Sequence, residues 1–374
     1  MKLMHLADLH LGKRLLKQSL EEDQAAILEE LLHIAAEERP DCVLIAGDVY
    51  DRDVPPEWAV RLFDDFLVRL RRLGPEICMI SGNHDSAERV AFGGRLLESG
   101  GVYVSPMYRG GIEPVVLRDE YGPVKLWPIP YLRPSEVRRF HPEEEIRTYQ
   151  DAMAVLLEGL SLDPTERNAV LVHQFISGAS TCESEERVVG GTDEISGELL
   201  ECFDYAALGH LHGPQWVRQE QIRYAGSPLK YSFSEAEQEK SVTIVELGPK
   251  GSRLIRTVPL KPLRELSRLR GSFEELTATG RCCEDYLEIT LTDEEEPLDA
   301  AARLRVHYPN LLSLRYDNSR TRSDLELSGI SEVERKSEAE LFAELFEQQN
   351  GRAPTEEMLD YLTGLIADLK EENV

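Results

Sequence analysis

Five short clusters of Asp, Asn and His residues, each directly after a hydrophobic run, hold the side chains most suited to chemistry. They are Asp8-Leu9-His10, Gly47-Asp48, Gly82-Asn83-His84-Asp85, His173 and Gly209-His210-Leu211-His212. Carboxylate, amide and imidazole groups with few cysteines nearby suit divalent metals that serve chemistry better than metals that serve structure. We therefore expect a dinuclear metal site where these clusters meet.

The spacing within the clusters suggests how two ions would be shared. Asp8 and His10 are two residues apart at a strand end, so their side chains point the same way, and His210 and His212 repeat this spacing. Asp48 has two carboxylate oxygens and can bridge two ions. The candidate ligands are Asp8, His10, Asp48, Asn83, His173, His210 and His212. With one bridge, this set gives each ion four protein contacts and leaves room for water and substrate.

His84 stands apart from these ligands. Its neighbour Asn83 is needed at the metal, so we expect His84 to face the substrate, where it can protonate a leaving oxygen or stabilise developing charge. Two ions about 3.5–4 Å apart can clamp a phosphate and lower the pKa of a water molecule between them. The expected reaction is hydrolysis of a phosphate ester.

Each cluster taken alone has a simpler interpretation. Asp48 follows a glycine and is typical of a turn. Asp85 or Ser86 is typical of a helix N-cap, and a single buried His173 is more often a core residue than a ligand. Five clusters after five hydrophobic runs favour the metal site over these separate explanations.

The hydrophobic runs before the clusters predict buried strands of one sheet, at 3–7, 42–46, 77–80, 169–172 and 205–208. Helical spacing of apolar residues predicts helices at 21–38, from Pro55-Pro56 to near Gly74, at 86–97 and at 143–160. Strands that alternate with helices indicate an α/β fold, in which ligands gather beyond the carboxyl ends of the strands.

The later part of the chain predicts further layers. A polar stretch at 177–192 is typical of a loop, and short β segments at 222–225, 242–247 and 254–258 predict a second sheet packed on the first. We expect a two-sheet α/β sandwich over residues 1–260 and a small α/β domain over 261–330. Two acidic amphipathic helices over 331–374 would either fold back on the chain or bind a partner.

The net charge, the cysteines and the apolar runs limit which partners and which cellular compartment we expect. A formal charge of −27 argues against tight DNA binding by the chain's own surface, because Lys and Arg contacts to phosphates supply most of that affinity. It leaves open a catalytic subunit whose metals and partner bring the positive charge. Six cysteines without a CxxC pair predict reduced thiols, and the lack of a signal peptide or long apolar run predicts a cytoplasmic protein without a membrane span.

The residues that flank the clusters narrow the expected class of phosphate-ester hydrolase. The segments 46–52, 81–86, 208–215 and 226–232 resemble those of the SbcD family of bacterial nuclease subunits, within the calcineurin-like metallophosphoesterases. Leu9 stands where many bacterial relatives have a Trp, which affects packing rather than ligation. The resemblance implies a metal-dependent double-strand DNA exonuclease and hairpin or single-strand endonuclease that acts in end processing, repair and recombination.

The same resemblance assigns roles within the site. It implies that one ion is held by Asp8, His10, Asp48 and His212, and the other by Asp48, Asn83, His173 and His210. It also implies that His84 acts on the leaving group and that manganese is the usual ion. The ligand types by themselves are also compatible with magnesium, iron and zinc.

The resemblance further implies partners. Residues 331–374 would attach to the coiled coil of an SbcC-type ATPase, and helices at 54–66 and 91–97 would form a homodimer. Lys13, Arg14, Arg52 and Lys230 would steer a DNA end or hairpin to the metals, and the complex would work at the nucleoid. Two alternatives remain, namely a phosphodiesterase or phosphomonoesterase for small molecules, and a DNA-end tether without catalysis.

Overall fold

The computed structural model describes residues 1–105, 107–185, 194–278 and 283–319, and the isolated positions 343, 354–355 and 358–359. It divides into two compact units, the first formed by 1–268 with 284–287 and the second by 269–283 with 288–374. The expected division into 1–260, 261–330 and 331–374 stays a prediction. The predicted pair of terminal helices lies almost wholly outside the described residues.

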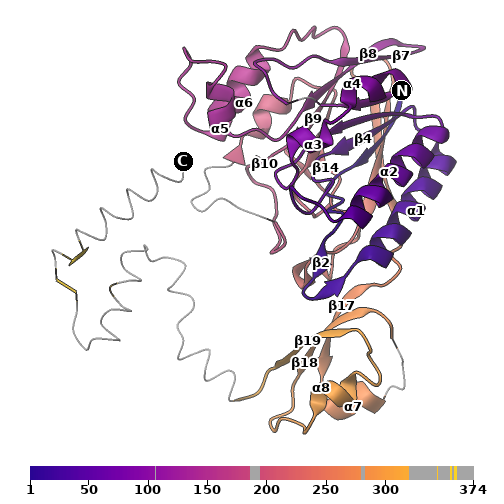
Figure 1. The fold of residues 1–374 in the computed structure, drawn as a ribbon, viewed down its shortest axis with the longest axis vertical. Helices are drawn as coiled ribbons and strands as arrows, with labels where there is room; N and C mark the ends of the chain where they lie inside the picture. Colours follow the sequence, from indigo (N-terminus) through magenta and orange to yellow (C-terminus); the bar gives the residue numbers. More distant parts are fainter. Residues whose placement is uncertain are drawn as a thin grey trace. The chain divides into compact units, whose positions relative to one another are not determined.

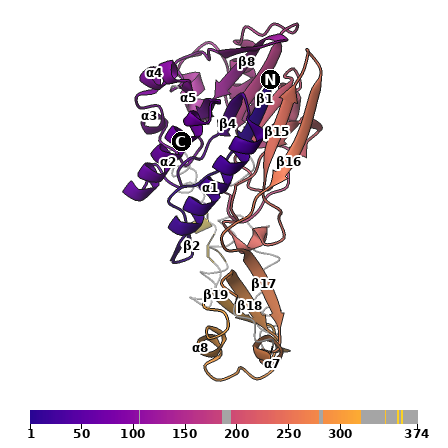
Figure 2. The ribbon, with the colours of Figure 1, turned by 90° about the vertical axis from the view of Figure 1, so that its right-hand side faces the viewer.

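The first unit is built on two six-stranded sheets. The order of the first sheet is β16-β15-β1-β4-β5-β6, in which β1, β4, β5 and β6 are parallel and β15 is antiparallel to β1 (Figure 2). Its strands are β1 (Lys2–Leu6), β4 (Cys42–Ala46), β5 (Glu76–Ile80), β6 (Val102–Val104), β15 (Ser241–Leu247) and β16 (Arg253–Pro259).

The second sheet has the order β13-β14-β12-β9-β8-β7. Here β8, β9, β12 and β14 are parallel, and β7 and β13 are antiparallel edge strands. The strands are β7 (Val115–Asp119), β8 (Gly122–Ile129), β9 (Arg167–His173), β12 (Tyr205–Gly209), β13 (Gln215–Val217) and β14 (Gln219–Tyr224).

Alternate residues along the strands fill two separate cores. Leu44 of the first sheet and Leu171 of the second share one core between the sheets. Val170 and Val172 point the other way, into a core with α6 (Tyr149–Glu158). The helices α5 (Pro134–Arg138) and α6 lie on one side of the stacked sheets, and α1 (Glu21–Glu38) and α2 (Glu57–Arg72) lie on the other (Figure 1).

Five predicted strands are confirmed, but their assignment to a single sheet is wrong. β1, β4 and β5 belong to the first sheet, whereas β9 and β12 belong to the second. The later segments β15 and β16, which we expected in the second sheet, instead extend the first. The carboxyl ends of strands from both sheets therefore meet at one place.

The helix predicted over 86–97 is interrupted in the structure. It forms two short helices, α3 (Ala87–Val90) and α4 (Gly94–Leu97), because Gly93 adopts a left-handed conformation with φ of 75° between them. The helix predicted over 143–160 begins later, at Tyr149, where the Thr148 side chain accepts a hydrogen bond from the Asp151 amide.

The second unit contains most of a three-stranded sheet in the order β17-β18-β19. Its elements are β17 (Leu266–Gly271), α7 (Phe273–Ala278), β18 (Tyr286–Leu291), α8 (Ala300–Leu304) and β19 (Leu311–Tyr316). Across both units, the part of the chain that the structure describes contains no helix with the length and apolarity of a membrane span.

The remaining short elements lie in the loops of the first unit. They are β2 (Arg14–Leu15), β3 (Gln18–Ser19), β10 (Phe175–Ile176), β11 (Glu194–Ile195) and the 3-10 turns Glu98–Gly100, Gly197–Leu200 and Phe233–Glu235. The five cysteines of the described residues are free thiols.

Candidate metal centre

The seven predicted ligands lie together at the carboxyl ends of strands from both sheets. The loop after β1 runs beside the loop after β4, since the amide of Asp8 donates to the Gly47 carbonyl at 3.1 Å and the amide of His10 donates to the Asp48 carbonyl at 2.9 Å. The amide of His210, after β12, donates to Asp8 Oδ1 at 2.9 Å. This last bond connects the two sheets at the site.

Four of the predicted ligands have a backbone conformation that side chains disfavour. The φ values are 54° at Asp8, 43° at His10, 47° at Asp48 and 101° at His210. Only eight non-glycine residues of the described ranges have positive φ, so half of them are at this site. Such conformations are unfavourable and cluster where function fixes a side chain.

Two glycines allow the loops to approach closely. A Cβ atom on Gly82 would lie 2.1 Å from Asp48 Oδ1, and one on Gly209 would lie 1.8 Å from the Ala46 carbonyl oxygen. Neither distance is sterically possible. The glycines before Asn83 and before His210 are therefore required by packing at the site.

One group of ligand atoms surrounds the side-chain oxygen of Asn83. His173 Nε2 and His210 Nδ1 each lie 3.0 Å from Asn83 Oδ1, and His173 Nε2 lies 3.4 Å from Asp48 Oδ2. His173 Nδ1 donates to the Ala46 carbonyl at 2.8 Å, which leaves Nε2 facing inward. Ligands about 2.1 Å from one octahedral ion lie about 3 Å apart, so this spacing fits a shared cation.

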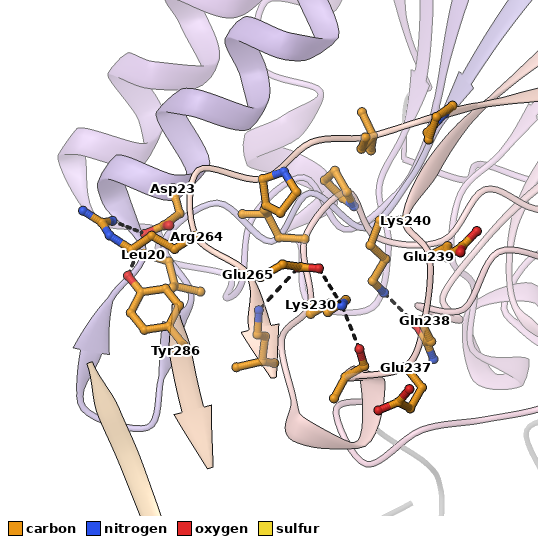
Figure 3. Close-up of a pocket in the computed structure, with 17 residues that line it drawn as sticks. Leu20, Asp23, Lys230, Glu237, Gln238, Glu239, Lys240, Arg264, Glu265 and Tyr286 are labelled. Carbon is orange, nitrogen blue, oxygen red and sulfur yellow. Dashed lines mark hydrogen bonds and ion pairs between the residues drawn. The ribbon is translucent and has the colours of Figure 1, made fainter. Parts of the chain in front are cut away.

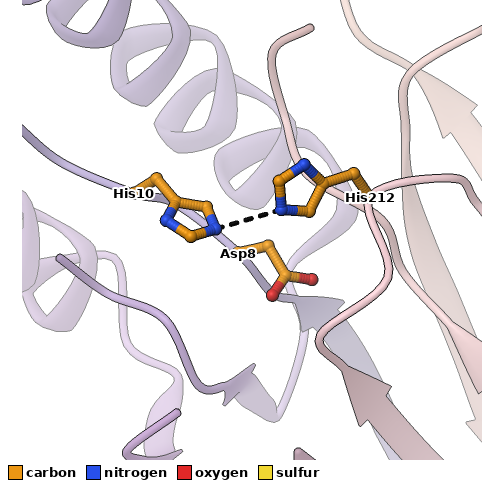
Figure 4. A group of neighbouring side chains, drawn as sticks. All are labelled: Asp8, His10 and His212. Atoms are coloured by element: carbon orange, nitrogen blue, oxygen red, sulfur yellow. Dashed lines mark hydrogen bonds between the residues drawn. The ribbon is translucent and has the colours of Figure 1, made fainter. Parts of the chain in front are cut away.

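A second group gathers around His10. Its Nε2 lies 3.0 Å from His212 Nε2 (Figure 4). The same atom lies 3.5 Å from Asp48 Oδ2. Asp8 lies within 4.8 Å of both imidazoles, and its buried Oδ2 atom has no hydrogen-bond partner among the described residues. A buried carboxylate oxygen without a donor is costly, and a cation would satisfy it.

Asp48 joins the two groups. Its Oδ2 atom lies 3.5 Å from His10 Nε2 and 3.4 Å from His173 Nε2, while Oδ1 accepts a hydrogen bond from the His84 amide at 3.0 Å. The residue is 2% exposed. The Asp48 carboxylate thus lies between the two sets of nitrogen atoms, a position from which it could bridge two ions.

Burial shifts the pKa values of several of the predicted ligands. Burial raises the pKa of Asp8, lowers the pKa of His10 well below its usual value and lowers the pKa of His210 to about 3. Burial also opposes charge on His173, but Asp48 outweighs it and raises the pKa of that imidazole to about 9. Two buried Asp side chains, Asp8 and Asp48, beside the neutral imidazoles of His10 and His210 form a donor set suited to divalent cations.

His84 lies beside the ligands. Its Nδ1 atom donates to the Asp51 carbonyl at 3.1 Å, and its Nε2 atom lies 4.0 Å from Asp48 Oδ2. The side chain is partly exposed, and its ring packs edge-on against His10. The ring therefore turns Nε2 toward the site and remains reachable from solvent.

Asp85 has a role that the sequence did not reveal. Its carboxylate accepts backbone hydrogen bonds from Val49 at 3.1 Å, Tyr50 at 2.9 Å and Gly82 at 2.9 Å. It thereby joins the loop of Asp48 to the loop of Asn83. Of the two predicted N-cap residues, Ser86 and not Asp85 occupies the N-cap position of α3, and its side chain makes no capping hydrogen bond.

The four predicted basic residues differ in availability. Arg14 and Arg52 are exposed, and they contact the Lys17 carbonyl and, at 3.9 Å, Asp51 Oδ2, respectively. Lys13 Nζ is paired more closely, with Asp51 Oδ1 at 2.6 Å. Lys230 Nζ binds Glu265 at 3.0 Å and the Ala236 carbonyl at 2.7 Å. Lys230 and Lys240 both line a cavity of about 390 Å³ (Figure 3).

A buried set of side chains behind His212 was also missed from the sequence. It comprises the buried Glu235 and Lys240 and the half-buried Ser184, with Glu235 0% exposed. Burial alone would raise the pKa of Glu235, but its contacts to His212 and Lys240 lower it to about 2. The Gly-Ser-Pro segment at 226–228 was the only signal that this region belonged to the site.

Comparison with known families agrees with this geometry. The family model described as calcineurin-like phosphoesterase matches residues 1–214, more than half of the chain, so the chain belongs to the calcineurin-like phosphoesterases. A model of the C-terminal domain of SbcD-type proteins, described as type 5 capsule protein repressor C-terminal domain, matches residues 262–350.

A curated relative identifies the family of the chain within the calcineurin-like phosphoesterases. The chain is 34% identical over 339 residues to the SbcD component of the SbcCD nuclease of Staphylococcus epidermidis, a match that covers 87% of this chain and 89% of the relative. The chain is thus a member of the SbcD family.

Solved structures are more distant. A dimetal phosphatase from Danio rerio is 10% identical, covers 70% of this chain and 98% of its own, and has a TM-score of 0.42. The protein TT1561 of Thermus thermophilus is 12% identical, covers 70% of this chain and 99% of its own, and has a TM-score of 0.41.

Proposed function

We propose that the chain is a metal-dependent DNA nuclease that works with an SbcC-type ATPase on DNA ends and hairpins. Membership of the SbcD family supports this activity, and the relative's name is that of a nuclease component. The observation that carries the proposal is Asp48 Oδ2, which lies within 3.5 Å of ring nitrogens from both ligand groups.

We propose that two manganese ions are held by the two groups. Asp8, His10, Asp48 and His212 would hold one ion, and Asp48, Asn83, His173 and His210 would hold the other. When bound, two such ions neutralise phosphate charge and activate water for an in-line displacement. Asp48 contacts both ligand groups and would hold them at a fixed separation.

His84 would protonate the leaving oxygen of the cleaved ester. The Asp51 carbonyl holds its Nδ1 proton, so Nε2 is the atom that can pass a proton to the substrate. The Asp85 carboxylate supports this step indirectly, since it fixes the backbone of both neighbouring loops.

Arg14 and Arg52 would meet the DNA backbone first, because both side chains are exposed. Lys13 would contact the DNA backbone once its ion pair with Asp51 is broken. Lys230 has the weakest support of the four, because its ammonium is already bound to Glu265 and to the Ala236 carbonyl.

We further propose a homodimer through the helices at 54–66 and 91–97. Phe92 and Leu96 are 86% and 81% exposed, and Val60 is 44% exposed, which is unusual for apolar side chains. Residues 261–330 would form a capping domain, and 331–374 would bind the ATPase coiled coil. Such a complex would act on DNA at the nucleoid in the cytoplasm.

The test is cleavage of labelled hairpin and linear DNA with manganese or magnesium, with and without an SbcC-type partner. Wild type should cleave both DNA substrates, and Asp48→Ala should not. Asp53→Ala is the matched control, since Asp53 lies in the same loop with an exposed side chain. Hydrolysis of small phosphodiesters without any DNA cleavage would favour the small-molecule alternative and reject the proposal.

Deletion of residues 331–374 tests the partner separately. The shortened chain should keep manganese-dependent cleavage of single-stranded DNA but lose binding to the ATPase. Intact partner binding and intact ATP-stimulated cleavage would reject the assignment of this segment.

A further inference from the structure

His212 is held on three sides by residues outside the metal-ligand clusters. Its Nδ1 atom lies 2.8 Å from Ser184 Oγ, and its amide donates to Glu185 Oε1 at 2.7 Å. Its carbonyl accepts a hydrogen bond from Lys240 Nζ at 2.8 Å. Both the ring and the backbone of this one ligand are therefore fixed.

The hydrogen bonds around Ser184 have a defined direction. Ser184 Oγ lies 2.5 Å from Glu235 Oε1, and a carboxylate can only accept, so the single hydroxyl proton of Ser184 points to Glu235. Ser184 Oγ must then accept a hydrogen bond from the N–H group at His212 Nδ1. His212 Nε2 is left with a free lone pair, directed at the centre that it shares with His10.

Glu235 is itself immobilised by charge and burial. Its Oε2 atom lies 2.5 Å from Lys240 Nζ, and its Oε1 atom accepts from the Tyr231 amide at 3.1 Å. Glu235 and Lys240 have side-chain exposures of 0% and 4%. Lys240 also donates to Ser227 Oγ at 2.9 Å, while the Ser227 amide donates to the His212 carbonyl at 3.1 Å.

These contacts explain why the Gly-Ser-Pro segment at 226–228, which holds no predicted metal ligand, belongs to the site. They also decide whether the residues behind His212 position that ligand or bind a third cation. Cys182, His212 and Glu235 offer ligand atoms within 4.8 Å of one another, which would suit a third cation. The ammonium group of Lys240 already neutralises Glu235, so a cation there would be repelled.

We propose that Ser184, Glu235 and Lys240 form a hydrogen-bonded relay that holds His212 with its Nε2 lone pair toward the metal centre. The proposal rests on the proposed two-metal function. The three residues position a ligand and do not touch the substrate. Partners that orient a metal-binding histidine in this way typically change metal affinity or activity about 10–100-fold when they are removed.

The test compares Ser184→Ala, Ser184→Thr and Ser180→Ala in the full chain. Ser180 lies in the same loop with an exposed side chain, and its observed hydrogen bonds use only its backbone. Manganese binding is measured by calorimetry, and the His212 tautomer is read in the metal-free protein by nitrogen-15 NMR. Ser184→Ala should weaken one of two ions about 10–100-fold and lose the Nδ1–H tautomer.

Ser184→Thr keeps the hydroxyl and should behave like wild type, as should Ser180→Ala. Wild-type affinity for both ions and an unchanged tautomer in Ser184→Ala would overturn the relay. Glu235→Gln should give the same loss as Ser184→Ala, and if it does not fold, Ser184→Ala decides alone. A wild-type chain that binds fewer than two ions would reject the proposed function, whereas the metal-free tautomer would still report on the relay.

Discussion

Replacement of Gly82 by alanine should damage the metal centre without unfolding the protein. A Cβ atom at this position would lie 2.1 Å from Asp48 Oδ1 and 2.5 Å from the Asp48 amide nitrogen. Gly82 has no positive φ, so alanine is compatible with its backbone conformation and the only obstacle is space. The substitution therefore acts on the position of Asp48.

The structure sets the size of the effect. Carbon and oxygen atoms that are not bonded need at least about 3 Å, so the Asp48 carboxylate or its loop must move by about 1 Å. A 1 Å misplacement of a catalytic group costs about 100-fold in rate. Overpacking of this kind costs about 1–3 kcal/mol in the free energy of unfolding, which a folded domain tolerates.

The assay measures manganese affinity, the rate of hairpin cleavage and urea denaturation for Gly82→Ala and for Gly100→Ala. Gly100 is the matched control, because a Cβ atom there would meet no atom within 4 Å. Gly82→Ala should lose about 100-fold in cleavage and bind both ions more weakly, and Gly100→Ala should match wild type. If Gly82→Ala binds two ions and cleaves at the wild-type rate, the bridging position of Asp48 is refuted.

Three further predictions concern other parts of the chain. His84→Gln should bind both ions normally but cleave about 10²–10⁴-fold more slowly, and weakened metal binding would make it a ligand instead. Phe92→Glu with Leu96→Glu should convert a dimer to a monomer in sedimentation, and an unchanged mass would exclude that helix from the interface. The pKa of Asp119 is held below its usual value by its hydrogen bond to Arg167, so its contribution to stability is present above about pH 4 and is lost as the pH falls further. Asp119→Asn should flatten this acid limb in denaturation curves, and an unchanged slope below about pH 4 would show that the pair contributes nothing.

The strands and their terminal ligands were predictable because local patterns encode them. The run before Asp48 is uniformly apolar, as expected for a strand buried on both faces, and it forms β4 as predicted. The division into two sheets was not predictable, since it depends on pairing between distant segments. β15 pairs with β1, although the two strands lie at opposite ends of the first unit's sequence.

The supporting polar residues were hidden for a different reason. Glu235 and Lys240 look like ordinary surface charges, because burial of such residues depends on a partner that the sequence does not identify. Asp85 precedes a helix and so resembles a cap, yet its carboxylate oxygens accept from amides of another loop. Local patterns therefore find metal ligands more readily than the residues that position them.

Anomalous diffraction from crystals grown with manganese would locate the bound ions. We expect two peaks about 3.5–4 Å apart, with the Asp48 carboxylate between them. Asp8, His10 and His212 should lie on one side, and Asn83, His173 and His210 should lie on the other. A single peak, or two peaks that Asp48 does not bridge, would contradict the two-metal site.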